Sequence, residues 1–298
     1  MWNLLCPECR APLAGTTCPA CNRTYQQVDG IWRMMTDNQI QHYTQFITDY
    51  ETVRSGEGRA GVDASWYRAL PLIERDQPFY SDWRIRAVSY RALLKHAVEP
   101  LENNGPLHII DLGAGNGWLS HRLAERGHTL AAVDVLDNNW DGLGAAQHYS
   151  LDFTRIQAPF ACLPLDAAQA DVVIYNGAFH YATDYVSTLR EALRVLKPGG
   201  RVVIMDSPMY HRADSGQQMV AERNAHFEQQ HGTRSDSLPF QNFLTYDLLD
   251  EIGEAVGLSW QLHAPFYGVK WSLRPVRARL RGHREPARFH IIIGERKS

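Results

Sequence analysis

The sequence has 298 residues, of which 44% are hydrophobic and 21% charged, and its formal net charge is −3. A globular chain of this length can bury a substantial core in one large or two smaller domains. The negative charge argues against a surface coated for nucleic acid, although it leaves room for a local basic patch. No apolar run reaches the length of a membrane span and the first residues lack a signal-peptide pattern, so we expect a cytoplasmic protein.

Four of the five cysteines lie in the first 21 residues, as two Cys-x-x-Cys pairs separated by eight residues. Each pair can present two thiolates to one ion, and two pairs complete a closed tetrahedral Zn²⁺ site with a structural role. The alternatives are two unconnected cysteine pairs or disulfides. Residues 23–35 favour two short strands joined by an Asp-Gly turn, and residues 1–35 resemble a small zinc ribbon. The expected zinc ligands are Cys6, Cys9, Cys18 and Cys21.

Residues 36–100 indicate a helical segment or lid that is rich in aromatic side chains. Helices are expected at 39–53 and 82–98, with a loop at 55–61 between them. The aromatic side chains could line a substrate pocket, or they could be ordinary core. Two arginines in the second helix could meet a carboxylate or lie in solvent. The residues in question are Trp66, Tyr67, Phe79, Tyr80, Trp83, Arg84 and Arg86.

Residues 101–298 change to strands that alternate with helices, which predicts a mostly parallel sheet. Helices are expected at 185–196 and 246–256, and a polar insertion follows Asp206. The last strand is expected to return as a hairpin beside the strand before it, and the segment between them carries seven basic residues and one acidic residue. The expected strands are 107–111, 129–133, 158–162 (weaker), 171–175, 201–205, 258–262 and 289–294.

The stretch from Asp111 to Gly117 combines the end of a strand, a glycine-rich loop and the start of a helix. Backbone N–H groups at such a helix start can face a bound ligand. A dinucleotide site needs a third glycine where this sequence has Trp118, and the Asp111 carboxylate would repel a pyrophosphate. The same carboxylate suits the amino group of a methionine moiety. Asp134, at the end of the next strand, is placed to accept ribose hydroxyls.

With these motifs, residues 107–296 resemble class I S-adenosylmethionine-dependent methyltransferases, a family that methylates small molecules, lipids and sometimes RNA. The resemblance also includes Asn176 to His180 and the Lys197-Pro-Gly-Gly200 turn. It implies a Rossmann-like, seven-stranded α/β sheet with an antiparallel last strand, here preceded by the ribbon and the helical segment. The acid that often binds adenine in this family is absent before Leu163, so Phe160 and backbone N–H groups are expected to hold that ring. The implied cofactor-binding residues are Asp111, Gly113, Ala114, Gly115, Asn116, Asp134, Phe160 and Asn176.

His180 is the candidate general base, because it follows a strand at the carboxyl edge and imidazole titrates near neutrality. The alternative is a histidine that packs at the strand end without proton transfer. Four further polar side chains are expected near the same edge, unranked: Tyr175, Asp206, Tyr210 and His211.

Two kinds of methyl acceptor fit the sequence. A small molecule is favoured by the acidic net charge, the aromatic segment and the insertion after Asp206. RNA is the alternative, because a zinc ribbon ahead of this fold resembles rRNA guanine methyltransferases and residues 274–288 could neutralise phosphates. A non-enzymatic alternative is a cofactor-binding partner protein. We expect an S-adenosylmethionine-dependent enzyme with a structural Zn²⁺.

Overall fold

The computed structural model describes residues 2–297, and its centre is one nine-stranded sheet. The strand order is β1-β2-β5-β4-β3-β6-β7-β11-β10, and β2 to β7 run parallel to one another wherever they pair. β11 pairs antiparallel with both β7 and β10, which confirms the expected antiparallel last strand. The strands are β1 (Gln27–Val28), β2 (Ile31–Arg33), β3 (His108–Leu112), β4 (Thr129–Asp134), β5 (Thr154–Gln157), β6 (Ala170–Asn176), β7 (Leu196–Met205), β10 (Leu258–His263) and β11 (Ile291–Arg296).

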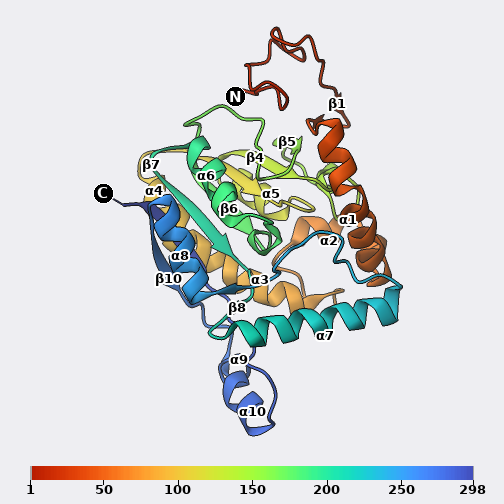
Figure 1. Cartoon of the computed structure of the whole chain (residues 1–298), viewed down its shortest axis with the longest axis vertical. Coiled ribbons are helices and arrows are strands. Elements are labelled where there is room, and N and C mark those ends of the chain that lie inside the picture. The colour runs from red at the N-terminus through yellow and green to blue at the C-terminus, as the bar shows by residue number, and fades with distance from the viewer. Residues whose placement is uncertain (1, 298) are drawn as a thin grey trace.

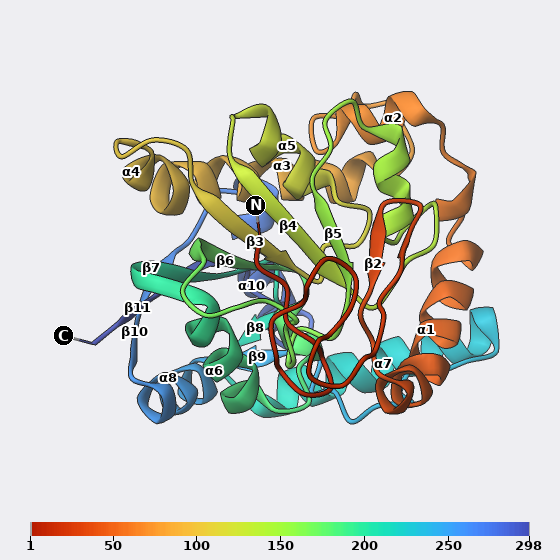
Figure 2. The ribbon, with the colours of Figure 1, turned by 90° about the horizontal axis from the view of Figure 1, so that it is seen from above.

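Helices cover both faces of this sheet, which gives three layers (Figures 1 and 2). α3, α4 and α5 lie on one face and α6 and α8 on the other, while α1 and α7 cross near the carboxyl ends of the strands. β8 (Met209–Tyr210) and β9 (Leu244–Thr245) form a separate two-stranded sheet. The α-helices are α1 (Asp37–Gly56), α2 (Ala64–Ala69), α3 (Tyr80–Leu93), α4 (Glu99–Glu102), α5 (Trp118–Glu125), α6 (Tyr185–Val195), α7 (Ala213–His231), α8 (Tyr246–Val256), α9 (Val269–Ser272) and α10 (Arg274–Leu280). The structure also has short 3₁₀ helices at Arg59–Gly61, Leu143–His148 and Phe179–Tyr181 and a π-helical turn at Leu94–Val98.

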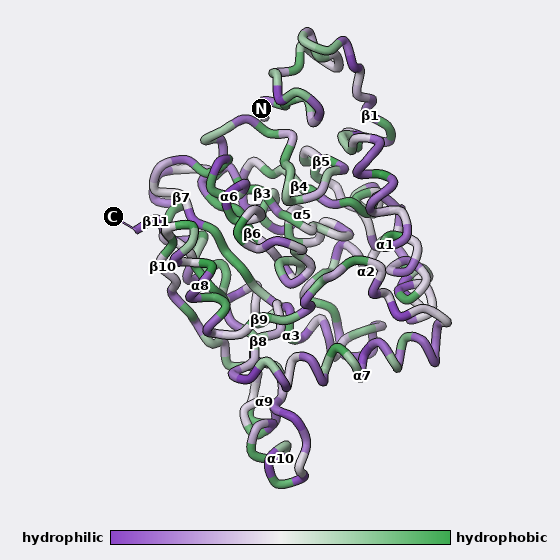
Figure 3. Tube along the Cα trace, viewed as in Figure 1, coloured by the Kyte–Doolittle hydropathy of each residue, from purple (hydrophilic) through white to green (hydrophobic). Residues whose placement is uncertain are grey.

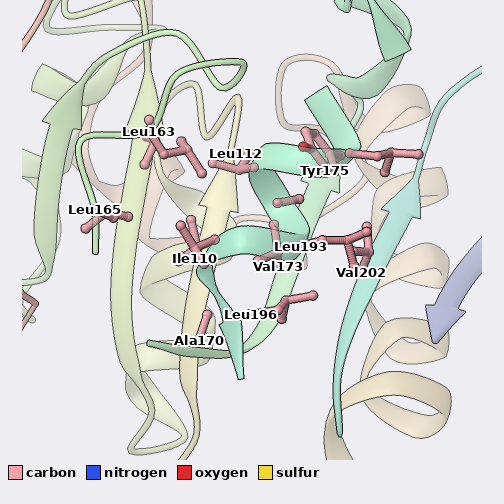
Figure 4. Close-up of a cluster of buried hydrophobic side chains, with 14 of the residues drawn as sticks. Ile110, Leu112, Leu163, Leu165, Ala170, Val173, Tyr175, Leu193, Leu196 and Val202 are labelled. Carbon is pink, nitrogen blue, oxygen red and sulfur yellow. The ribbon is translucent and has the colours of Figure 1, made fainter. Parts of the chain in front are cut away.

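Alternate residues of the central strands supply the two halves of the core. Ile110 and Leu112 of β3 and Val173 and Tyr175 of β6 face α6, where Leu193 packs on them (Figure 4). The intervening residues face α3 and α5 on the other side of the sheet. Because both faces are covered, these strands are apolar throughout rather than alternating.

The N-terminal segment is part of the same sheet. Asp29 and Gly30 both have positive φ, as a tight β1–β2 turn requires, and this confirms the expected Asp-Gly hairpin. Ile31 then pairs parallel with Arg155 of β5. The sheet therefore has nine strands where seven were expected, because the hairpin adds two at its edge.

Three other expectations need correction. The third strand of the central domain is 154–157, not 158–162, because Pro159 has no N–H to donate to the ladder. The loop expected at 55–61 begins inside α1, which a Thr36–Gln39 capping box starts and which runs to Gly56. The basic segment before the last strand folds as α9 and α10, with Pro275 in the first turn of α10, and only the flanking strands pair.

Within residues 2–297, none of the helices combines the length and the apolar character that crossing a bilayer would need.

Candidate active site

The glycine loop after β3 meets the turn after β6 at the carboxyl edge of the sheet. The chain proceeds from β3 toward one side of the sheet and from β6 toward the other, so these two strands flank the point where ligands bind in such folds. Gly113 has φ +69°, and a Cβ there would lie 2.3 Å from the Cβ of Ala178. Only glycine fits at this contact, and the exposed backbone of the loop is left open to a ligand.

Asp134, at the end of β4, is held against the loop by its own carboxylate. One oxygen accepts the Gly115 N–H at 2.7 Å and the other accepts the Leu136 N–H at 2.8 Å. The side chain is buried, and burial raises the pKa of Asp134 to about 6 in spite of these hydrogen bonds. Each oxygen keeps one lone pair for a hydroxyl or a cation.

Asp111 lies beneath the loop rather than beside the cavity. Its carboxylate is fully buried, and one oxygen accepts the Ser120 hydroxyl at 2.9 Å while the other has no partner within residues 2–297. Burial raises the pKa of Asp111 to about 7. The structure thus places this side chain where it ties β3 to α5, outside the set of residues that line the cavity.

The other expected cofactor contacts come together around one cavity of ≈ 120 Å³. Its floor is the glycine loop, and its sides are the segments that follow β4, β5 and β6. Phe160, from the segment after β5, lies close to Gly113 and packs edge-on against Tyr175. The expected residues in the lining are Gly113, Ala114, Gly115, Asn116, Asp134, Phe160 and Asn176.

Comparisons with known proteins assign this region. Residues 110–204 match the family model of a methyltransferase domain. An uncharacterized methyltransferase of Mycobacterium tuberculosis is 31% identical over 148 residues, which cover 48% of this chain and 52% of that protein. A malonyl-acyl-carrier-protein O-methyltransferase of Hahella chejuensis is 36% identical over 100 residues, 33% of this chain and 36% of the relative.

A solved structure extends the likeness of the fold. It is the 1,6-didemethyltoxoflavin-N1-methyltransferase of Burkholderia thailandensis with bound 1,6-didemethyltoxoflavin and S-adenosylhomocysteine, at a TM-score of 0.50 and 15% identity over 93% of this chain and 97% of that one. Residues 110–204 thus match a methyltransferase domain, and the chain shares the fold of this S-adenosylhomocysteine-bound enzyme. It spans about half the length of the M. tuberculosis relative and about a third of the H. chejuensis one.

Helix α1 lies in the segment 36–100 that the sequence predicts as a helical lid, and it contributes three side chains to the cavity. Phe46, Tyr50 and Arg54 lie one turn apart on α1 and line the cavity. Arg54 forms a two-pronged ion pair with Asp141, from the segment after β4, with 3.2 Å between Nη2 and Oδ1. The four-residue spacing of Phe46, Tyr50 and Arg54 places them on one helix face. No local pattern in the sequence indicates which loop that face covers.

The aromatic residues of the following segment divide between core and site. Trp66, Tyr67 and Trp83 are almost fully buried in the core on the α3 side, which confirms the core interpretation for these three. Arg86 lines the cavity with its guanidinium over the Trp83 ring at 4.7 Å. It has a charged neighbour in Asp206 but no ion pair within residues 2–297.

His180 does not line the cavity of the methyltransferase domain. It is 7% exposed, and its Nδ1 lies 3.1 Å from the Ser207 hydroxyl. Burial, together with the Arg223 charge, lowers the pKa of His180 to about 3. A base works best when its pKa is near the operating pH, so this geometry favours the packed-histidine alternative.

Of the four polar residues that the sequence placed near this edge without ranking, Asp206 lies beside the candidate site. It follows β7 directly, has φ +53°, and packs beside Gly177 at the cavity wall. One carboxylate oxygen accepts the Ser89 hydroxyl at 2.5 Å, and Ser89 lies 3.0 Å from the Tyr267 hydroxyl. The other oxygen is buried without a partner within residues 2–297, and burial raises the pKa of Asp206. Left-handed backbone at a non-glycine residue is typical of functional positions.

The remaining three of these residues lie elsewhere. The Tyr175 hydroxyl donates to the Thr188 carbonyl inside the core. Tyr210 lies against Arg284, and His211 stacks on Tyr246.

The four N-terminal cysteines meet in one cluster. Their sulfur atoms all lie within 4.8 Å of one another, with 3.7 Å between Cys6 and Cys21 and 3.4 Å between Cys9 and Cys18. A tetrahedral ion with Zn–S bonds of about 2.3 Å separates its sulfurs by roughly 3.8 Å, so the donor set fits Zn²⁺. All four cysteines are free thiols, which excludes disulfides in this structure.

Proposed function

We propose that the protein transfers the methyl group of S-adenosylmethionine to a small-molecule acceptor held between the glycine loop and α1. The observation that carries this proposal is the convergence of Gly113, Asp134 and Asn176 on one cavity that a lid helix covers. Lid coverage suits a compact acceptor, because an RNA duplex or loop would need an open face. The H. chejuensis relative is named for malonyl-acyl-carrier-protein and the solved structure binds a small heterocycle, which supports the same class.

The residues present fit the cofactor. Position 113 must be glycine, because an added Cβ would lie 2.3 Å from the Cβ of Ala178. The absence of a side chain at Gly113 would let a ligand approach the backbone of the loop. Asp134 would accept the ribose hydroxyls with its free lone pairs, and Phe160 would cover the adenine ring. Arg86, which has no ion pair within residues 2–297, would bind a carboxylate of the cofactor or the acceptor.

When bound, S-adenosylmethionine supplies an electrophilic methyl group, so the protein's task is to position the acceptor and exclude water. α1 excludes water by closing over the cavity. No general base is assigned, because His180 and Asp206 both lie outside the cavity lining and the unpartnered oxygen of Asp206 is buried.

The cysteine cluster would hold one structural Zn²⁺. Four sulfur ligands leave no open position, so the ion would fold the N-terminal segment and take no part in methyl transfer.

The test combines binding with transfer. Wild-type protein is titrated with S-adenosylmethionine by calorimetry and then incubated with methyl-labelled cofactor and fractionated cell extract. We expect label in the small-molecule fraction. Label in RNA would replace the proposed acceptor class, and tight binding without any transfer would favour the cofactor-binding partner.

Two glycine-to-alanine variants, one at the cavity and one away from it, provide a matched comparison of cofactor binding. Gly113→Ala is expected to weaken cofactor binding more than about tenfold, because the new methyl group collides with Ala178. Gly199→Ala has a similar positive φ of +77° but nothing within 4 Å of the new Cβ, so it should keep wild-type binding. Equal binding by wild type and Gly113→Ala would place the cofactor elsewhere.

A further inference from the structure

The segment α9–α10 projects from the body of the molecule below α7 and β8 (Figure 1). We call residues 266–284 the projection. Five of its hydrophobic side chains are exposed, four of them by more than half and Leu280 by 81%. Few surfaces of a monomeric protein leave this many aliphatic and aromatic groups in water on one short helical element without a partner. The five are Phe266, Val269, Leu273, Val276 and Leu280.

The exposed groups of the projection form one row. Leu273, at the N-terminus of α10, and Val276 and Leu280 within it are spaced by three and four residues, which places them on one helix face. Val269 lies four residues before Leu273, on α9. Hydrophobic and hydrophilic residues alternate along this part of the chain in Figure 3. The row belongs to a segment that projects from one end of the molecule, where it can reach a flat surface (Figure 1).

Basic side chains flank this row on both sides. Helical spacing puts Arg277 and Arg281 on one side of it and Arg279 on the other. The region from 266 to 288 has seven basic residues and one acidic residue, in a chain of formal net charge −3. Glu222 pairs with Arg284 and Glu285 lies 4.0 Å from Arg288, whereas the other basic residues of the region have no ion pair within residues 2–297.

Several arginines of the projection line a cavity of ≈ 490 Å³ between α10 and α7. Arg274, Arg277 and Arg281 line it from α10, and Gln218 lines it from α7. Arg274 is also held over the Trp271 ring at 4.1 Å. A cavity lined by several arginines, with Glu222 already occupied by Arg284, fits phosphate oxygens.

We infer that the projection docks on an anionic lipid surface, with the apolar row inserted among the acyl chains and the arginines on headgroup phosphates. An apolar face flanked by Lys and Arg is the signature of helices that lie in the membrane interface. RNA or a highly acidic protein segment would use the arginines but gains nothing from the exposed Leu280 and Val276. Both are therefore less favoured partners.

Vesicle co-sedimentation of the full chain tests this inference. Binding is compared between vesicles of phosphatidylcholine alone and vesicles with equal parts of phosphatidylglycerol. We expect at least about tenfold stronger binding to the anionic vesicles, and weaker binding as salt is raised. Equal partition into both kinds of vesicle, or into neither, would overturn the proposal. So would retention of the chain by RNA or an acidic protein with no vesicle binding.

Matched variants locate the contact. Leu280→Asp and Val276→Asp should each reduce vesicle binding at least about tenfold, because an apolar group leaves the bilayer. Ile40→Asp, on α1 at 51% exposure against 55% for Val276, should not.

Charge reversal gives a second pair of variants. Arg277→Glu is expected to reduce binding to anionic vesicles by at least about fivefold, while Arg190→Glu on the exposed side of α6 leaves it unchanged. All five substituted positions lie on exposed helix faces, so thermal unfolding should match wild type in every variant. Projection variants that bind vesicles as wild type does would contradict the docking surface.

Discussion

Asp134 shows how burial can set both the geometry and the pH response of a binding group. Its two backbone hydrogen bonds fix the carboxylate between the glycine loop and the segment after β4. The same burial disfavours its charge and raises its pKa from 3.8 to about 6. Asp141 lies near enough to add to this shift, but its own charge is engaged by Arg54.

Cofactor affinity is predicted to fall at acid pH because Asp134 is then protonated. Below about pH 6 the loss should approach tenfold per pH unit, and above about pH 7 the affinity should level off. The stability of the free protein should respond in the opposite sense. The folded state binds the proton more tightly than the unfolded chain, so this group's contribution falls as pH rises from about 4 to about 6. Calorimetric titrations and urea unfolding across this range measure both.

An Asp134→Asn variant supplies the control for that profile. It should bind the cofactor more weakly and lose the slope below pH 6. A wild-type slope in this variant would assign the titration to another group, of which Asp111 is the nearest candidate.

At the level of elements, α1 connects the N-terminal segment to the cavity. Its N-terminus is fixed by the Thr36 capping box, and its last turns are fixed by Arg54 on Asp141. Phe46 also packs edge-on against Phe240, in the segment between α7 and β9. The helix is therefore held at both ends and along its length. Within residues 2–297 the Arg54–Asp141 ion pair and the hydrogen bond from Asn138 to Glu51 tie it to the loop after β4.

Arg54→Met is predicted to loosen this lid. The side chains of Arg54 and Asp141 are 16% and 10% exposed, so Asp141 would be left nearly buried without its partner. We expect a loss of about 2 kcal/mol in the free energy of unfolding, below the roughly 3–5 kcal/mol of a fully buried pair. Arg212→Met breaks a pair whose side chains are 74% and 78% exposed and should cost about 0.5 kcal/mol or less. Equal losses in the two variants would show that the Arg54 pair does not anchor α1.

The sequence predicted the central strands well because each is an apolar run that ends in a turn or an acid. The positions of β3, β4, β6 and β7 and the glycine loop follow from such local patterns. Strand β5, which lies between β2 and β4, is short and polar, so its position depended on its neighbours. The lid contacts of α1, the proximity of Asp206 to Gly177 and the burial of His180 depend on packing between distant segments. No local spacing carries that information.

On the scale of the whole molecule, the cysteine segment and the methyltransferase domain share one core. Trp2, Cys6 and Tyr25 are buried in the cluster that also contains β4 and β5 residues. Arg10 reaches α6, where it pairs with Glu191 at 3.0 Å. Figure 2 shows the segment lying over β4 and β5 beside α6, on the face of the sheet that α6 and α8 cover. The order of this segment therefore affects the strands that carry the cofactor residues.

Loss of Zn²⁺ is predicted to destabilise both the ribbon and the adjacent sheet edge. Cys18→Ser should remove the metal and reduce the hydrogen-exchange protection of β5 as well as of β2, because Ile31 to Arg33 pair with β5. Metal analysis and hydrogen exchange measure the two effects. Cys162→Ser, outside the cluster, should retain stoichiometric zinc. Unchanged protection of β5 in the metal-free Cys18→Ser protein would contradict this coupling.

The pairing of β2 with β5 also has a consequence for the order of folding. Ile31 is synthesised long before its neighbour Arg155, so the hairpin leaves the ribosome with no sheet to join. The proposed Zn²⁺, held by the four cysteines, would order the ribbon before β5 is synthesised. Once β5 is synthesised, the hairpin can pair with it through β2. The unpaired edge of β5 is then no longer open to other nascent chains.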